Sequence, residues 1–177
     1  MELRSSQWLL RPMAGSDHAE VFCGLSHPDV TRHYGVCFET LEASREQMTW
    51  YAELVRSGTG IWWSIRSAEE ETFLGAIGLN DIEMVHRRGE LGFWLLPDHW
   101  RKGIMGQVLP LVIDHAFRSI GLHRIQAQVE TGNIASARVL QRAGFVQEGT
   151  LRECEWKDGH PISLDLYALL NMDTLER

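Results

Sequence analysis

The order strand, helix, strand in residues 90–129 restricts the fold of this chain more than any other feature. Glu90–Leu96 is a short and largely apolar run, as in a buried strand. Apolar residues then recur at helical spacing from Val108 to Ile120, and Gly121 follows as a natural C-terminal cap. Arg124–Val129 alternates polar and apolar residues, which is typical of a half-buried strand. Two strands joined by a crossover helix predict a parallel pair, so a purely antiparallel sheet is excluded.

The rest of the chain predicts further strands and helices around this unit. Strands are expected at Gln7–Arg11, Ile61–Ile65 and Phe73–Leu79, and a last hairpin at Phe145–Arg152 and Ile162–Leu169 around a turn at 157–161. Helices are expected at His18–Leu25, at Leu41–Val55 and from Asn133 to Arg142. The three strands between residues 61 and 96 form an antiparallel meander. We therefore expect an α/β fold whose sheet is mixed, of the α+β kind.

Four residues mark the ends of the first two of these helices. Ser16 and Ser44 are good caps before them, since a serine hydroxyl can accept a hydrogen bond from an unpaired N–H of the first turn. Pro28 is expected to end the first helix, and Gly58 the second.

Composition limits the class of protein. The chain has 177 residues, of which 44% are hydrophobic and 23% charged, which is ordinary for one globular domain spanning residues 1–177. A formal charge of -7 argues against a nucleic-acid surface and mildly favours a cationic or neutral partner. No run of 18 apolar residues exists, and the N-terminal run is too short for a secretion signal, so we expect no membrane span and a cytoplasmic location.

The cysteines and histidines indicate no metal site and no disulfide framework. Cys23, Cys37 and Cys154 are odd in number and irregularly spaced, so we expect buried or idle thiols. The histidines show no spacing typical of metal ligands.

Two basic residues and two glycines stand where the crossover helix begins. Arg101 and Lys102 precede Gly103, and Gly106 follows in the first turn. A helix start offers unpaired N–H groups and the positive end of the helix dipole, which together favour a phosphate. The glycines are equally consistent with an ordinary turn, and the segment is neither a Walker loop nor a dinucleotide fingerprint.

Three runs in order give this loop a context: RGELGFWLLPDHWRKGIMGQ (88–107), FRSIGLHRIQAQV (117–129) and NIASARVLQRAGF (133–145). Together they resemble the GNAT acetyltransferase superfamily, and within it the RimJ/RimL-like branch. The resemblance extends from HPDVTRHYG (27–35) through GAIGLNDIE (75–83) to the end of the chain. It implies the GNAT acyl-CoA N-acyltransferase fold, a central, mostly antiparallel mixed sheet with two splayed parallel strands and flanking helices.

The resemblance also implies acetyl-CoA as cofactor. Its pyrophosphate would lie against residues 101–106, and its pantetheine arm between the strands at 90–96 and 124–130. The residues of this loop are Arg101, Lys102, Gly103, Ile104, Met105 and Gly106. The family pattern is Gln/Arg-x-x-Gly-x-Gly/Ala, from which Trp100 and Met105 depart here. Pro110 removes a helical hydrogen bond, so we expect a bend or loosening in the first turns of this helix.

Acetyl transfer to an amine needs a base, donors for the developing oxyanion and an acid for the departing thiolate. The backbone N–H groups of Leu95 and Leu96 are the candidate donors. Glu90 is the candidate base, directly or through a water. The alternatives are that Glu90 forms an ion pair with Arg87 or Arg88, and that a chain of water molecules alone removes the proton.

The candidate acid lies in the helix that follows Asn133. Many family members carry a tyrosine in the helix after Asn133, where this chain has Leu140. Ser136 can instead hydrogen-bond the sulfur or cap its helix, and Asn133 can bind the pantetheine arm or cap the same helix. Direct transfer is expected, because no cysteine holds a motif position that indicates a covalent acetyl-enzyme.

The acceptor is expected to be a primary amine. The resemblance favours the N-terminal α-amine of a protein or peptide, with a polyamine or aminoglycoside, or a non-catalytic acyl-CoA sensor, as alternatives. His33, Tyr34 and Glu39 match the family's substrate lid, or are ordinary polar residues of a loop. Trp50, Trp62 and Trp63 are expected in the core or in a pocket wall. Relatives commonly form dimers, so a homodimer is possible, whereas nucleic-acid and membrane partners are not expected.

Overall fold

The protein is described here from a computed structural model, which describes residues 1–174. The strands are β1 (Leu3–Arg4), β2 (Trp8–Pro12), β3 (Ile61–Ser67), β4 (Phe73–Glu83), β5 (Arg88–Leu95), β6 (Arg124–Glu130), β7 (Val146–Lys157) and β8 (His160–Leu170). The α-helices are α1 (His18–Leu25), α2 (Pro28–Thr31), α3 (Arg45–Ser57), α4 (Ile104–Asp114) and α5 (Ile134–Arg142). Short helical segments occur at η1 (Gly15–Asp17), η2 (Pro97–His99), η3 (His115–Ile120) and η4 (Asn171–Thr174).

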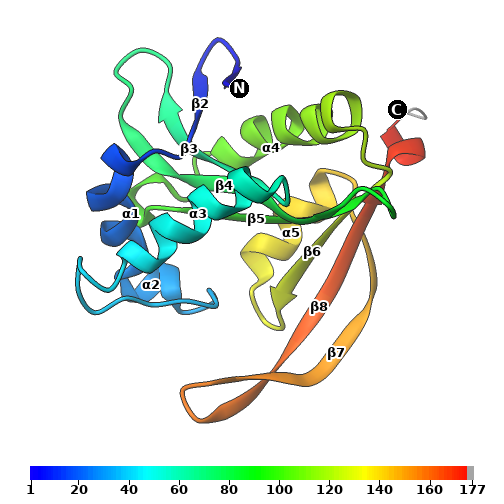
Figure 1. Cartoon of the computed structure of the whole chain (residues 1–177). Coiled ribbons are helices and arrows are strands. Elements are labelled where there is room, and N and C mark those ends of the chain that lie inside the picture. Colours follow the sequence, from blue (N-terminus) through cyan, green and yellow to red (C-terminus); the bar gives the residue numbers. More distant parts are fainter. Residues whose placement is uncertain (175–177) are drawn as a thin grey trace.

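The strands form one eight-stranded sheet in the order β1-β2-β3-β4-β5-β6-β8-β7 (Figure 1). Neighbouring strands are antiparallel except β5 and β6, which are parallel and joined by α4 and η3. The predicted mixed sheet, its meander β3–β4–β5 and its parallel pair are therefore confirmed.

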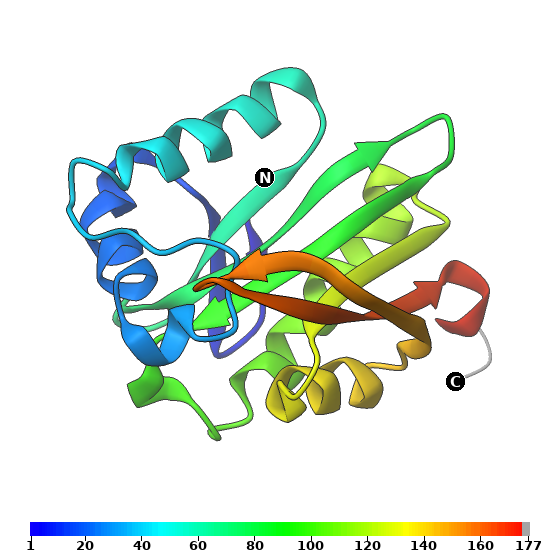
Figure 2. The same ribbon diagram turned by 90° about the horizontal axis from the view of Figure 1, so that it is seen from below.

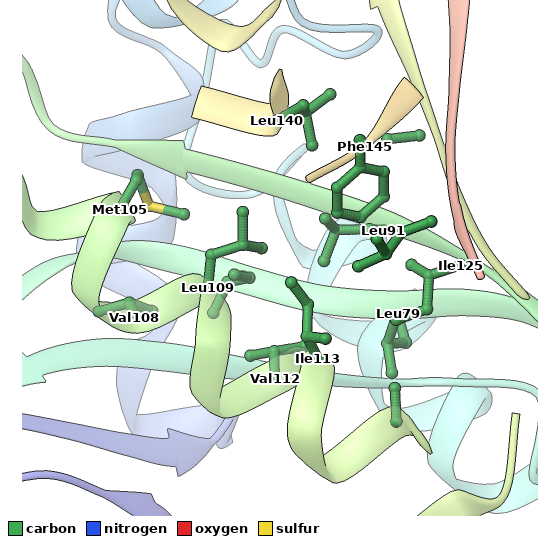
Figure 3. Close-up of a cluster of buried hydrophobic side chains, with 14 of the residues drawn as sticks. Leu79, Leu91, Met105, Val108, Leu109, Val112, Ile113, Ile125, Leu140 and Phe145 are labelled. Atoms are coloured by element: carbon green, nitrogen blue, oxygen red, sulfur yellow. The ribbon is translucent and has the colours of Figure 1, made fainter. Parts of the chain in front are cut away.

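The two faces of the sheet carry different clusters because side chains alternate along each strand. Figure 3 shows the face under α4, where helix residues pack on Leu79 of β4, Leu91 of β5 and Ile125 of β6. Leu140 of α5 and Phe145 complete this larger cluster. On the opposite face a smaller cluster joins α1 and α3 to the strands through Leu25, Tyr51, Trp62, Phe73 and Trp94.

Some expected helix ends are wrong. Pro28 begins α2 instead of ending α1, because a proline lacks the N–H that the first position of a helix leaves unpaired anyway. Asp17, not Ser16, directly precedes α1. Ser44 does precede α3, but its hydroxyl donates to the Leu41 carbonyl rather than capping the helix.

The crossover helix α4 runs through Pro110 without interruption. The irregular part lies after it, where η3 is π-helical, and the segment ends at Gly121 in the left-handed region.

None of the helices in residues 1–174 combines the length and apolar character needed to cross a bilayer. Cys23, Cys37 and Cys154 are exposed free thiols, so of the two expectations for them, buried or idle, burial does not hold.

A long hairpin projects at the end of the sheet. β7 and β8 extend beyond the predicted strands and meet at Asp158 and Gly159, both of which have positive φ, as the tight turns of hairpins require. Figure 2 shows the tip of this hairpin beside the loop that follows α2. The Lys157 ammonium donates a hydrogen bond to the Arg32 carbonyl across this contact.

Trp62 lies across two neighbouring strands that carry glycine at the matching positions. Trp62 pairs with Gly78 of β4, which in turn pairs with Gly92 of β5. A Cβ atom at Gly78 would lie 2.2 Å from Trp62 Cγ, and one at Gly92 would lie 2.8 Å from Trp62 Cη2. Both glycines are therefore required by the close approach of the indole.

We expect Gly78→Ala to destabilise the protein by about 1–3 kcal/mol, because the added methyl group overlaps a buried ring. Gly15→Ala is the matched control, since a Cβ there meets no atom within 4 Å. Urea unfolding followed by circular dichroism measures both free energies. Equal stability of the two variants would show that Trp62 moves aside at little cost.

Candidate active site

The parallel strands β5 and β6 pair over a short length and then part. Their register contains only Arg88 with Arg124, Gly89 with Ile125 and Glu90 with Gln126. Beyond this point β5 stays paired with β4 as far as Leu95, and β6 stays paired with β8 as far as Glu130. Each strand therefore turns an edge without a strand partner toward the gap, and such an edge binds an extended, amide-bearing ligand well.

The register decides which N–H groups of β5 face this gap. The Leu96 N–H donates to the Leu74 carbonyl at 2.9 Å, so it points toward β4. Because antiparallel hydrogen bonds alternate along a strand, the main-chain groups of Leu91, Phe93 and Leu95 point toward β6. Leu96 is therefore wrong as an oxyanion donor, since its N–H is already used, whereas Leu95 keeps this candidate role. Leu91 and Phe93 are further gap-facing positions that the sequence analysis missed.

Trp100 has a role in shaping this edge. Its indole N–H donates to the Leu95 carbonyl at 2.7 Å. The tryptophan that departs from the family's loop pattern thus satisfies the last acceptor of β5 and ties the loop to the strand end.

The loop at 101–106 has the geometry of an anion site. Arg101 and Gly103 both have positive φ, and Gly103 directly precedes α4 without any side-chain cap. Ile104 and Met105 bury their side chains in the α4 cluster, whereas Arg101, Lys102, Gly103 and Gly106 are exposed. The first N–H groups of α4 have no helical partner and carry the positive end of its dipole. This donor set fits a pyrophosphate.

A cleft of about 730 Å³ opens on the face opposite α4. It lies between the loop after α2, α3, the middle of the sheet and the β7–β8 hairpin. Its walls are formed by His33, Tyr34, Gly35, Val36, Cys37, Phe38, Glu46, Gln47, Trp50, Trp62, Asn80, Glu90, Leu91, Gly92, Gln128, Glu130, Glu155, Trp156, Lys157, Ile162 and Leu164. Four of these side chains are carboxylates and only Lys157 is a permanent cation, so the cleft suits a positively charged ligand.

Glu90 lies where this cleft meets the gap between the strands, at the last paired position of β5 and β6. The amides of Gln126 and Gln128 donate to its Oε2 at 3.3 and 3.1 Å. Burial is the main cause that raises the pKa of Glu90 above its ordinary value, and the nearby charges of Asp81 and Glu155 raise it further. The two amide hydrogen bonds oppose this shift. A half-buried carboxylate with raised proton affinity is suited to accept a proton.

The alternative for Glu90, an ion pair with Arg87 or Arg88, is not formed. Arg88 pairs with Glu83 at 2.7 Å, and Arg87 donates to the Gly121 carbonyl at 2.8 Å.

Two of the three predicted lid residues reach the cleft. His33 and Tyr34 line it, whereas Glu39 is exposed and lies outside its walls. His33 Nδ1 lies 3.1 Å from Glu130 Oε1, and Lys157 Nζ lies 3.1 Å from Glu130 Oε2. Glu130 thus holds the loop after α2 and the tip of the hairpin together at the end of β6. Burial raises the pKa of Tyr34 well above its ordinary value, so its hydroxyl stays protonated at neutral pH.

The start of α5 resolves part of the question about its polar residues. Asn133 Oδ1 accepts a hydrogen bond from the Ser136 N–H at 3.2 Å, so Asn133 caps the helix. The Ser136 hydroxyl makes no hydrogen bond with any residue in 1–174 and is half-buried, which leaves it free for a ligand. Leu140 is fully buried in the α4 cluster and supplies no acid.

The chain is similar to known proteins over most of its length. Residues 7–146 match the family model described as acetyltransferase (GNAT) domain. The chain is 33% identical over 169 residues to the uncharacterized N-acetyltransferase YoaA of Bacillus subtilis, covering 95% of this chain and 96% of that protein.

Solved structures with similar folds include two acetyltransferases that are named for different acceptors. RimL, a ribosomal L7/L12 alpha-N-protein acetyltransferase in complex with coenzyme A, has a TM-score of 0.87 at 21% identity, covering 96% of this chain and 98% of that one. Spermidine N-acetyltransferase from Vibrio cholerae, in complex with CoA and spermine, has a TM-score of 0.86 at 21% identity, covering 97% and 99%.

We expect Gly106→Glu to weaken binding of coenzyme A about ten-fold relative to Gly106→Gln, because only the former puts a negative charge beside the anion site. A Cβ at Gly106 meets no atom within 4 Å, so neither variant disturbs the fold. Isothermal titration with coenzyme A at low salt measures both affinities. Equal affinities for the two variants would place the phosphates elsewhere.

Proposed function

This chain belongs to the GNAT acetyltransferase family and is an acetyl-CoA-dependent N-acetyltransferase, and from this premise we propose that its acceptor is the N-terminal α-amine of a protein or peptide, as in RimJ/RimL-like enzymes. The observation that carries the proposal is the place of Glu90, a half-buried carboxylate between the acidic cleft and the gap between β5 and β6. An amine that enters through the cleft meets this carboxylate at the point where the cofactor arm would lie.

The acidity of the acceptor favours an α-amine. An α-ammonium has a pKa of about 8, whereas an alkylammonium such as that of lysine has a pKa of about 10.4. At neutral pH the α-amine therefore loses its proton to a carboxylate such as Glu90, whose pKa is raised by burial, more readily than an alkylamine does. The volume of the cleft, about 730 Å³, also leaves room for the residues that follow the first one.

Three roles in the transfer, those of base, oxyanion donor and donor to the leaving sulfur, fall to residues of this chain. When bound, acetyl-CoA supplies the acetyl group as an activated thioester. Glu90 takes the proton of the acceptor ammonium through its Oε1 atom, since the amides of Gln126 and Gln128 donate to Oε2. The gap-facing N–H groups of β5, at Leu91, Phe93 and Leu95, are the proposed donors to the oxygen on which negative charge develops. The Ser136 hydroxyl is the proposed donor to the leaving sulfur.

A second acceptor, a polyamine, is favoured by one specific observation. Glu46, Glu90, Glu130 and Glu155 all line the cleft, and several carboxylates can hold several ammonium groups. Among the proteins of similar fold, the spermidine N-acetyltransferase of Vibrio cholerae is solved in complex with CoA and spermine. Release of thiol from acetyl-CoA, measured with peptides that start with Ser, Ala or Met, with spermidine and with an aminoglycoside, distinguishes the acceptors. Turnover of spermidine without any peptide would contradict the proposal.

We expect Glu90→Gln to lower kcat by about 10²- to 10⁴-fold while coenzyme A still binds. In the wild type, kcat/KM falls as pH falls through the raised pKa of Glu90, because the protonated carboxyl cannot accept a proton; the variant lacks this dependence. Glu69→Gln, at the exposed turn between β3 and β4, is the control for loss of one negative charge. Coenzyme A binding with unchanged turnover in Glu90→Gln would remove Glu90 from catalysis.

The same substitution is expected to stabilise the fold at neutral pH. A raised folded-state pKa means that the folded protein holds this proton more tightly than the unfolded chain does. The contribution of Glu90 to stability is therefore lost as pH rises from its unfolded pKa through its folded pKa, and it stays unfavourable above that window. Thermal unfolding of Glu90→Gln at acidic and neutral pH should show a gain over wild type that appears only at the higher pH.

A further inference from the structure

Trp62 combines deep burial with a place in the cleft wall. Its exposed fraction is 3%, yet it is one of the residues that line the cleft. The ring lies flat over Gly78 and Gly92, and it contacts the rings of Tyr51 and Trp50 with centroids 5.4 and 5.9 Å away. The sheet contacts the ring through Gly78 and Gly92, and α3 contacts it through Trp50 and Tyr51. The indole is therefore a fixed part of the floor and not a mobile cover.

The far edge of this indole lies close to the reacting groups. Its Cζ2 and Cη2 atoms are the ones that a Cβ at Gly92 would meet. Gly92 is two residues after Glu90 on the same strand and the same face of the sheet, which places it about 7 Å along the strand. It also lies in the part of β5 that has left β6. Substituents on the carbon that bears the acceptor amine must fit between Glu90 and this edge.

We infer that Trp62 determines the size of the side chain next to the acceptor amine: it admits the small first residues Gly, Ala and Ser and excludes Leu and Phe. This inference rests on the proposed function, since it takes the amine to be positioned at Glu90. Glycine at 78 and 92 is what allows the indole to fill the floor up to this point. A smaller side chain at 62 would leave room beside the amine that neither glycine fills.

Two substitutions of Trp62 separate the effect of side-chain volume from the effect of the polar indole N–H. The Trp62 Nε1 atom is buried and has no hydrogen-bond partner among the described residues. Trp62→Phe removes this unsatisfied donor and keeps an aromatic ring, whereas Trp62→Leu removes much of the ring volume. A change of acceptor preference that follows volume alone must be larger in Trp62→Leu than in Trp62→Phe.

Trp94 is the matched control for loosening of the cluster. It belongs to the same apolar cluster, has an exposed fraction of 5%, and also has a buried indole N–H without a hydrogen bond of ordinary geometry. Its ring packs against Gly24 of α1, where a Cβ would lie 2.1 Å from Trp94 Cζ3, and Trp94 does not line the cleft. Trp94→Leu therefore creates a comparable cavity away from the acceptor.

The experiment compares kcat/KM for paired acceptors in wild type, Trp62→Leu, Trp62→Phe and Trp94→Leu. The pairs are peptides that differ only in a first residue of Ala or Phe, and the simple amines propylamine and 2-phenylethylamine. We expect the ratio of bulky to small acceptor to rise at least ten-fold in Trp62→Leu, in line with the discrimination that a few methylene groups give in a pocket. We expect it to stay unchanged in Trp94→Leu. Coenzyme A binding and thermal unfolding verify that each variant is folded.

The outcomes separate this inference from the proposed function. If peptides turn over but the ratio is unchanged in Trp62→Leu, or rises equally in Trp94→Leu, the inference is wrong and the proposed function stands. If only the simple amines turn over, the proposed acceptor is wrong, and the ratio for the amine pair still decides the role of Trp62. If Trp62→Leu does not fold, the same ratio in Trp62→Phe decides, with a smaller rise expected and no rise contradicting the inference. If no amine turns over in the wild type, both ideas fall.

Discussion

The early parting of β5 and β6 is the constraint on which the rest of the site depends. Parallel strands joined by a helix normally pair along their length, and here pairing stops after Glu90. β5 stays paired with β4, and β6 stays paired with β8, so the two facing edges remain extended although they no longer pair with each other. The indole N–H of Trp100 donates to the Leu95 carbonyl at the end of β5, and α4 begins soon after, at Ile104. The anion loop, the gap and Glu90 therefore follow one another along a single stretch of chain.

The two faces of the sheet serve different purposes at this point. The face under α4 is closed by a large apolar cluster, and this fixes the loop at 101–106 through the buried side chains of Ile104 and Met105. The opposite face is less completely covered, because the smaller cluster of α1 and α3 ends beside an acidic cleft. Alternation along β5 places Glu90 and Gly92 on that open face. Under the proposed function, a cofactor held from one side and an acceptor entering from the other would meet at the strand edge.

The sequence predicted the sheet and the parallel pair because both depend on local periodicity and on glycine, whereas the anion-binding role of the loop at 101–106 stays a prediction. Prediction from the sequence failed where the result depends on register. Whether the N–H of Leu95 or of Leu96 faces the gap follows from pairing with β4, and a shift of one residue would exchange them. A proline such as Pro28 is compatible with the end of one helix and with the start of the next, and here it begins α2. The packing of Trp62 on Gly78 and Gly92 depends on the alignment of three strands, so the sequence of any one strand does not predict it.

The packing of Trp62 on Gly78 and Gly92 also restricts the order in which this floor can change during evolution. A larger residue at either glycine is harmful while the indole is present, because its Cβ would overlap the ring. The same change becomes harmless once position 62 is small. Substitutions at contacting residues are therefore not additive here, and a path to a new floor must begin at position 62. Descendants of this chain that have altered position 78 or 92 are expected to have lost the tryptophan first.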